Sequence, residues 1–161
     1  MMKVVSLFFT GLMLCTVSAI AQPAAGSSAD TNMEILKEKL KADKKLLVAS
    51  NMELSDAEAK KFWPLYDSYQ MDLNQVNLKL GETIKAYAEA FNKGSIPDNT
   101  AKKLLNDVLS MEEQEIKLKR TYAQKLEKVL PYNKVARYIQ IENKIRAVIK
   151  MELAQQIPLA Y

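Results

Sequence analysis

Apolar and aromatic side chains recur at alternating spacings of four and three along residues 62–87. They are Phe62, Tyr66, Tyr69, Leu73, Val76, Leu80, Thr83 and Tyr87. This spacing keeps them on one side of an α-helix over roughly four heptads, which favours lengthwise packing against other helices. The long stretches between glycines and prolines show helical periodicity and no strand-like alternation. The sequence therefore predicts an all-α fold.

A capping box predicts where the helix that carries this seam begins. In Ser55-Asp56-Ala57-Glu58, the Ser55 hydroxyl can accept a hydrogen bond from the Glu58 amide while the Glu58 carboxylate reaches back to residue 55. Asn92-Lys93-Gly94 supplies the stop signal, because glycine tolerates the backbone conformation that ends helices.

Three further helices are expected, which gives about four helices arranged as long hairpins. They span about residues 32–50, about 98–130, and a last stretch that opens with Leu130-Pro131 and ends before Pro158. Glu112 is expected at the edge of the third helix's apolar stripe, with its carboxylate in solvent. The expected core stripes are Leu105, Val108, Leu109, Ile116, Tyr122, Ala123, Leu126 and Leu130 in the third helix, and Val135, Tyr138, Ile141, Ile145, Val148 and Met151 in the fourth.

The first 21 residues have the pattern of a secretory signal peptide. Lys3 precedes an apolar run over residues 4–20, and Ala19-Ile20-Ala21 forms a small-x-small cleavage site. The alternative is an uncleaved membrane anchor, since an apolar run of 17 residues is at the short edge of what can span a bilayer. Cleavage after Ala21 is favoured because small and polar residues dilute the run, namely Ser6, Thr10, Gly11 and Ser18.

Cleavage would give an exported protein without stable membrane insertion. Residues 22–31 are small and polar and indicate a flexible leader. Residues 32–161 then form one all-helical domain, which is long enough to enclose a sizeable core.

The composition argues against an enzyme or a metal protein. The chain has no histidine, and its one cysteine, Cys15, lies in the signal peptide. Transition-metal sites, catalytic triads and histidine acid–base chemistry therefore lose their usual residues. We expect no cofactor and no metal, and acid–base chemistry by Glu, Asp or Tyr is the remaining enzymatic alternative.

Positive charge gathers in the second half of the chain. Residues 101–161 hold 12 Lys and Arg against 7 acidic residues, a surplus that can attract acidic proteins or anionic lipids. Four basic residues off the expected core stripe of the last helix are candidates for partner binding: Arg137, Lys144, Arg146 and Lys150. An ordinary solvated surface is the alternative, and nucleic acid is not expected as a partner of an exported protein.

Pro64 lies beyond the first turn of the helix that starts after Ser55. Its ring removes the amide that would bond the carbonyl of Lys60, which bends a helix. The bend either wraps this helix around its own core or presents the neighbouring aromatic residues to a partner. Phe62, Trp63 and Pro64 are therefore also candidate partner-binding residues.

Two helix starts resemble each other, LSDAEAKKF at 54–62 and LPYNKVARY at 130–138. The chain here resembles the Spy/CpxP family of periplasmic stress proteins, whose signature is a repeated Leu-Thr-x-x-Gln. The first start matches this signature at Leu54, with conservative changes at Ser55 and Glu58, whereas the second keeps only Leu130.

The resemblance implies a curved antiparallel homodimer of helical chains. It further implies a periplasmic, ATP-independent chaperone that holds unfolded proteins on a basic, partly apolar surface, or an envelope-stress adaptor. A metal-binding branch of the family uses histidines, which this chain lacks. The alternative is a non-enzymatic regulatory or structural envelope protein with one fixed partner, such as a stress-sensor domain. For the motif residues themselves we expect roles in helix capping and hairpin closure.

Overall fold

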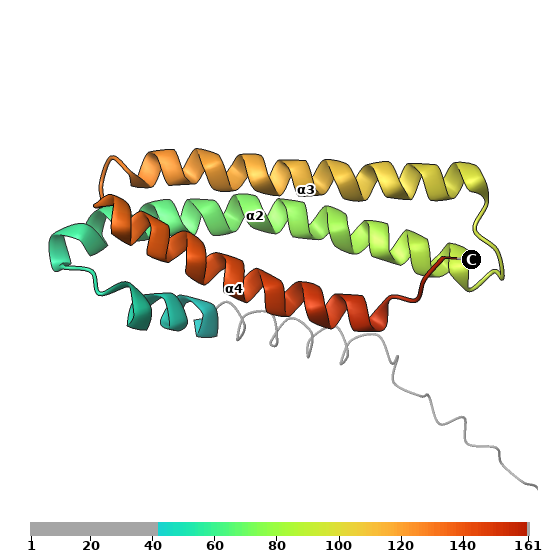
Figure 1. Cartoon of the computed structure of the whole chain (residues 1–161), viewed down its shortest axis with the longest axis horizontal. Coiled ribbons are helices and arrows are strands. Elements are labelled where there is room, and N and C mark those ends of the chain that lie inside the picture. The colour runs from blue at the N-terminus through green and yellow to red at the C-terminus, as the bar shows by residue number, and fades with distance from the viewer. Residues whose placement is uncertain (1–41, 161) are drawn as a thin grey trace, which may run out of the picture. The chain divides into compact units, whose positions relative to one another are not determined.

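A computed structural model describes residues 42–160, which belong to one compact unit, Ala42–Tyr161. Figure 1 shows that they form helical residues 42–52 and three long helices, α2 (Asp56–Phe91), α3 (Asp98–Leu126) and α4 (Tyr132–Gln156). These residues contain no strand, so the predicted all-α fold is confirmed. The predicted signal peptide, the leader and residues 32–41 of the predicted domain lie outside the described residues.

Helix α2 begins and ends where the sequence signals predict. The Ser55 hydroxyl accepts a hydrogen bond from the Glu58 amide, and the Glu58 carboxylate accepts one from the Ser55 amide at 2.8 Å. At the other end, turn residues 92–94 follow Phe91, and Gly94 has a φ of 89°, in the left-handed region that glycine adopts at little cost.

Pro64 lies inside α2, which continues beyond it to Phe91. The Ser68 hydroxyl donates to the Pro64 carbonyl at 2.9 Å, one turn further on. Phe62 is fully buried and Trp63 packs against the core. The burial of these two large side chains offsets part of the roughly 3 kcal/mol by which proline destabilises a helix interior.

An aromatic core lies where the start of α2, the end of α3 and the start of α4 meet. Its rings pack edge to face, with centroids 5.2 Å apart for Phe62 and Tyr138 and 5.3 Å apart for Tyr69 and Tyr122. Helical residues 42–52 cover this end with Val48 and Met52. The buried cluster is Val48, Met52, Phe62, Tyr66, Tyr69, Leu73, Tyr122, Leu126, Leu130, Val135 and Tyr138.

The predicted core stripe of α3 is wrong in its first half. Leu105, Leu109 and Ile116 are exposed, whereas Leu104, Met111 and Glu115 are buried. The inward side of the helix is thus rotated by about one residue from the side with the most leucine and isoleucine. Glu112 is exposed, as predicted.

The predicted stripe of α4 is wrong in its second half. Val135 and Tyr138 are buried as expected, and the inward side then continues at a spacing of four through Glu142 and Arg146. Val148 and Met151 are exposed. Hydropathy alone misplaces this stripe, because it assigns Glu142 and Arg146 to the surface. Both can be buried because each pairs with an opposite charge.

The two similar helix starts lie side by side. The Lys134 ammonium donates to the Glu58 carboxylate at 2.6 Å and to the carbonyl of Glu53 at 2.9 Å. Glu58 and Lys134 are the fifth residues of the two similar stretches, whose first residues, Leu54 and Leu130, both pack in the core. This geometry agrees with the capping and hairpin-closing roles expected of these residues.

We predict that the Glu58 contacts make stability fall in acid. Hydrogen bonds from Lys134 and from the Ser55 amide lower the pKa of Glu58 from 4.5 to about 2. Because the folded pKa is the lower one, this stabilisation is complete above about pH 4.5 and is lost as the pH falls toward 2. Urea unfolding of Glu58→Gln should show a smaller loss of stability between pH 5 and pH 3 (about the range set by that shift) than the wild type.

The exposed Glu113 provides a matched control, because Glu113→Gln should keep the wild-type slope of stability against pH. If Glu58→Gln also kept the full wild-type slope, the Glu58–Lys134 contact would not be responsible for the acid sensitivity.

Candidate functional site

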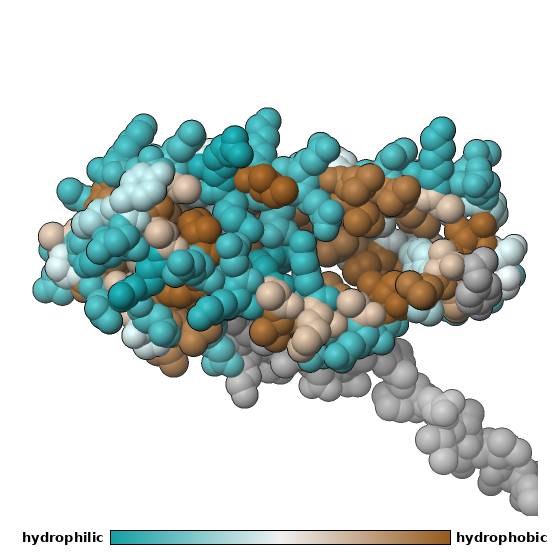
Figure 2. Space-filling model, viewed as in Figure 1, coloured by the Kyte–Doolittle hydropathy of each residue, from teal (hydrophilic) through white to brown (hydrophobic). Residues whose placement is uncertain are grey.

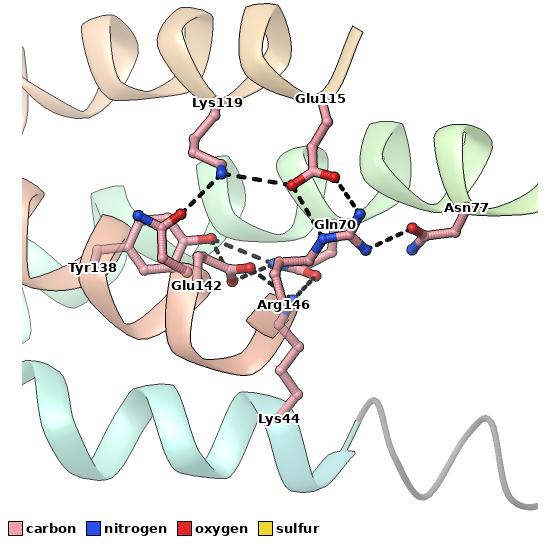
Figure 3. A network of polar contacts seen from close by, with 9 residues as sticks. Lys44, Gln70, Asn77, Glu115, Lys119, Tyr138, Glu142 and Arg146 are labelled. Atoms are coloured by element: carbon pink, nitrogen blue, oxygen red, sulfur yellow. Dashed lines mark hydrogen bonds and ion pairs between the residues drawn. The ribbon is translucent and has the colours of Figure 1, made fainter. Parts of the chain in front are cut away.

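A fully buried carboxylate lies near the middle of the three long helices. Glu142 of α4 accepts hydrogen bonds from Lys44 and Gln70, each at 2.8 Å, and from the Tyr138 hydroxyl at 3.1 Å. The Gln70 side-chain carbonyl accepts a second hydrogen bond from Lys44 at 2.8 Å. Figure 3 shows that these side chains come from α2, α4 and helical residues 42–52. The pairing joins three segments through one buried charge.

A second buried carboxylate pairs with Arg146, which lies one turn beyond Glu142 on α4. Glu115 of α3 accepts hydrogen bonds from two nitrogens of the Arg146 guanidinium, which also donates to the Asn77 side chain at 2.8 Å (Figure 3). Glu115 and Arg146 are 7% and 6% exposed. A fork-to-carboxylate pair of this kind fixes orientation as well as distance, so it sets the register of α4 against α2 and α3.

Several nearby cations stabilise the ionised form of Glu115. Burial by itself would raise its pKa, but the hydrogen bonds and charge of Arg146, with Lys150 and Lys119, lower the pKa below its ordinary value. The Lys119 ammonium is 3.5 Å from Glu115 and donates to Asn143 at 2.9 Å. Glu115 is therefore ionised in the folded protein at neutral pH.

The two pairs form a polar layer, which we define as Lys44, Gln70, Asn77, Glu115, Glu142 and Arg146. On one side of the layer lies the aromatic core. On the other side, α2 continues from Leu80 to Tyr87, α3 comes in from Asp98, and α4 continues past Lys150. Beyond the polar layer α4 diverges from α3 (Figure 1).

An apolar groove with a volume of about 830 Å³ opens on this second side. Figure 2 shows its hydrophobic atoms in the hollow between α3 and α4. The α2 side chains form its floor, Val76, Leu80, Thr83, Ile84 and Tyr87, and the apolar walls are Leu104, Leu105, Val108 and Met111 of α3 with Leu153 and Ala154 of α4 and Ile157 beyond it. Charged side chains at its ends and rim are Asp98, Lys102, Glu112, Glu115, Arg146 and Lys150.

Large apolar side chains continue from the groove onto the surface of α3. Leu105, which lines the groove, is 59% exposed, and Leu109 and Ile116 follow it at helical spacing. Single exposed leucines are common, but a hollow lined by apolar atoms and bordered by more of them marks an interaction site.

The predicted partner-binding surface around Pro64 is only partly exposed. Phe62 was predicted to contact partners and is instead fully buried, because it completes the aromatic core against Tyr138. Trp63 is half-buried, and the Lys45 ammonium lies 5.2 Å from the centre of its ring. Pro64 is exposed. The start of α2 is mainly a packing surface.

The predicted basic residues have different roles. Arg146 was predicted to lie on the surface and is instead buried against Glu115. Arg137 pairs with Glu53 at 3.2 Å, and Lys144 is exposed without an ion pair among residues 42–160. Lys150 lies at the groove, 3.5 Å from Glu112. Of the predicted partner-binding residues that are accessible, Lys150 alone lines the groove.

Sequence reasoning missed the groove because its residues follow the pattern of a core. Val76, Leu80 and Tyr87 were predicted to pack lengthwise against other helices, and α2 does continue the seam through them. The signal that distinguishes them lies on α4, where Arg146 and Lys150 replace apolar residues on the inward side. Two basic residues at these positions indicate where the close packing of apolar side chains ends.

Within the described part of the chain, no group of three or more His, Cys, Asp or Glu residues is arranged to hold a metal ion. The helices of residues 42–160 include none that is long and apolar enough to cross a bilayer. Comparisons with protein-family models, with curated proteins and with solved structures find no match for this chain.

We predict that removing one partner of the buried Glu115–Arg146 pair strongly destabilises the fold. Arg146→Met leaves a buried carboxylate without its main partner and should lower the free energy of unfolding by about 3–5 kcal/mol. Adding Glu115→Leu should recover most of this loss, because an apolar pair of similar volume can replace a buried ion pair. Urea unfolding measures both effects.

The exposed pair Lys103–Asp107 provides the control. Lys103→Met should lower the free energy of unfolding by less than about 1 kcal/mol, because exposed ion pairs contribute little to stability. An Arg146→Met variant as stable as Lys103→Met would show that the polar layer does not hold the helices together.

Two buried tyrosines next to the polar layer should respond differently to loss of their hydroxyls. Burial and the charge of Glu142 raise the pKa of both Tyr69 and Tyr138. The Tyr138 hydroxyl donates to Glu142, whereas that of Tyr69 has no hydrogen-bond partner among the described residues. Tyr138→Phe should destabilise the protein by about 1–3 kcal/mol, and Tyr69→Phe should be neutral or stabilising. Equal losses in thermal unfolding would contradict this assignment.

Proposed function

We propose that this protein is a non-enzymatic, ATP-independent protein-binding protein of the periplasm that holds apolar segments of unfolded or envelope proteins in its groove. The observation that carries the proposal is the open apolar hollow of about 830 Å³ between α2, α3 and α4. Its wall of leucine, valine and methionine side chains suits varied apolar clients, because such contacts are non-directional.

The dimensions of the groove favour a polypeptide segment in helical form. Its floor extends from Val76 to Tyr87, twelve residues of α2 or roughly 16 Å at the helical rise. Floor and wall side chains recur at spacings of three and four, which matches the ridges of a docking helix. A helix of about three turns with one apolar stripe would fill the groove.

The charge of the two helices that flank the groove favours neutral or acidic clients. Helices α3 and α4 together carry 11 basic and 7 acidic residues, a net charge of +4. The groove itself is lined by three cations, Lys102, Arg146 and Lys150, and by three carboxylates, Asp98, Glu112 and Glu115, so the surplus lies on the helix surfaces around it. Association with acidic segments should therefore be faster at low salt.

The N-terminal sequence and the resemblance to the Spy/CpxP family support the periplasmic part of the proposal. Residues 1–21 have the pattern of an export signal, and the stretch from Leu54 to Glu58 keeps the leucine of the family motif with conservative changes at Ser55 and Glu58. The homodimer that the resemblance implies stays a prediction.

An envelope adaptor with one fixed partner is the second candidate. The concentration of apolar lining in the groove favours it, since a selective partner needs a shaped site. An adaptor would bind one segment tightly and have no effect on aggregating model substrates, whereas a chaperone would suppress their aggregation.

We predict that a charge placed in the groove abolishes client binding. Leu105→Asp puts a carboxylate on the groove wall at a side chain already 59% exposed, so the fold should survive. The purified mature chain should suppress aggregation of a reduced, unfolded model protein without nucleotide. Leu105→Asp should reduce this suppression at least about tenfold, because the burial of one leucine contributes roughly 1.5–3 kcal/mol.

The control variant is Leu78→Asp, on a side of α2 that does not line the groove, where the leucine is 51% exposed. It introduces the same charge and should keep wild-type activity. Equal losses in both variants, or no suppression by the wild type, would contradict the chaperone proposal.

A further inference from the structure

The chain crosses the wide end of the groove after α4 ends. Ile157 has an extended backbone, with φ −95° and ψ 113°, and Pro158 prevents the helix from continuing. Figure 1 shows the chain then running toward the C-terminal end of α2. The Tyr87 hydroxyl donates to the Pro158 carbonyl at 2.9 Å, and Ile157 and Ala160 line the groove. We call residues 157–160 the strap.

The strap is held in place by few contacts. Tyr87 is positioned by stacking on Phe91, with ring centroids 6.0 Å apart and planes at 29°. Besides the Tyr87–Pro158 hydrogen bond between neutral groups, the Ile157 amide donates to the Leu153 carbonyl at 3.1 Å at the end of α4. Ile157 is half-buried and Leu159 is 86% exposed. A hydrogen bond of this kind contributes little to stability because water competes for both groups. Releasing the strap should therefore require much less free energy than opening the aromatic core at the other end of the bundle.

The anchor of the strap is also the last residue of the groove floor. A helix of three turns lying from Val76 to Tyr87 would reach the place where the strap crosses. The far wall of the groove at this point is the strap itself, through Ile157 and Ala160. A bound segment longer than the floor would therefore compete with the closed strap for this end of the groove.

We propose that the strap is an autoinhibitory gate, which closes the wide end of the groove through the Tyr87–Pro158 hydrogen bond and swings away when a client segment binds. This inference rests on the proposed function of the groove. Only the open fraction of the protein is competent to bind, so the measured affinity is the intrinsic affinity reduced by that fraction. Loss of the hydrogen bond raises the open fraction and tightens binding.

The test compares Tyr87→Phe, which keeps the ring and removes the donor, with Tyr132→Phe at an exposed tyrosine that does not line the groove. The probe is a fluorescent 14-residue acidic peptide (about four turns) with leucines at i, i+4, i+7 and i+11. Tyr87→Phe should bind it about two- to tenfold more tightly, through faster association, as loss of one neutral hydrogen bond implies. Tyr132→Phe should behave as the wild type.

A shortened chain without residues 158–161 removes the acceptor carbonyl and should show the same gain, which guards against a folding defect in Tyr87→Phe. Carboxypeptidase should also release the tail faster from free Tyr87→Phe than from Tyr132→Phe. Equal tail release, or peptide binding by Tyr87→Phe that is equal to or weaker than wild type, overturns the gate while leaving the groove's function intact. No peptide binding by any of the proteins overturns both proposals.

Discussion

The pairing of two buried carboxylates with two cations determines how the helices of this protein pack. Glu142 accepts hydrogen bonds from Lys44, and Glu115 accepts them from Arg146, on successive turns of α4 where α2 and α3 also contribute polar side chains. A buried charge without a partner would be costly, so the helices must keep the register that maintains both pairs. Packing on either side of these turns follows from that register.

The polar layer separates two ends with different properties. On one side, edge-to-face aromatic rings and the motif leucines form a closed core that the Glu58–Lys134 contact secures. On the other side, α4 diverges, and the apolar residues of α2 and α3 line a groove instead of a core. Stability thus resides at one end and the proposed binding surface at the other, so groove residues can change with little effect on folding.

Local signals predicted α2 well because its start and stop depend on neighbouring residues: the Ser55–Glu58 capping box and Gly94 act within one turn. The stripes of α3 and α4 were partly wrong because hydropathy treats Glu115 and Arg146 as surface residues, whereas each is buried by the other. Their pairing depends on contacts between distant parts of the chain, which spacing within one helix does not reveal. The prediction for Phe62 was wrong because its burial likewise depends on a distant residue, Tyr138 of α4.

The most direct test of this account is to map where a client binds, by following the backbone amide signals of the isotopically labelled mature protein during titration with an unfolded, reduced model protein. The account predicts that the signals of residues 76–87, 101–111 and 150–157 shift or broaden, while those of residues 62–69 around Trp63 stay unchanged. Changes confined to the start of α2, or spread evenly over the surface, would contradict the claim that the open end of the bundle is the binding site.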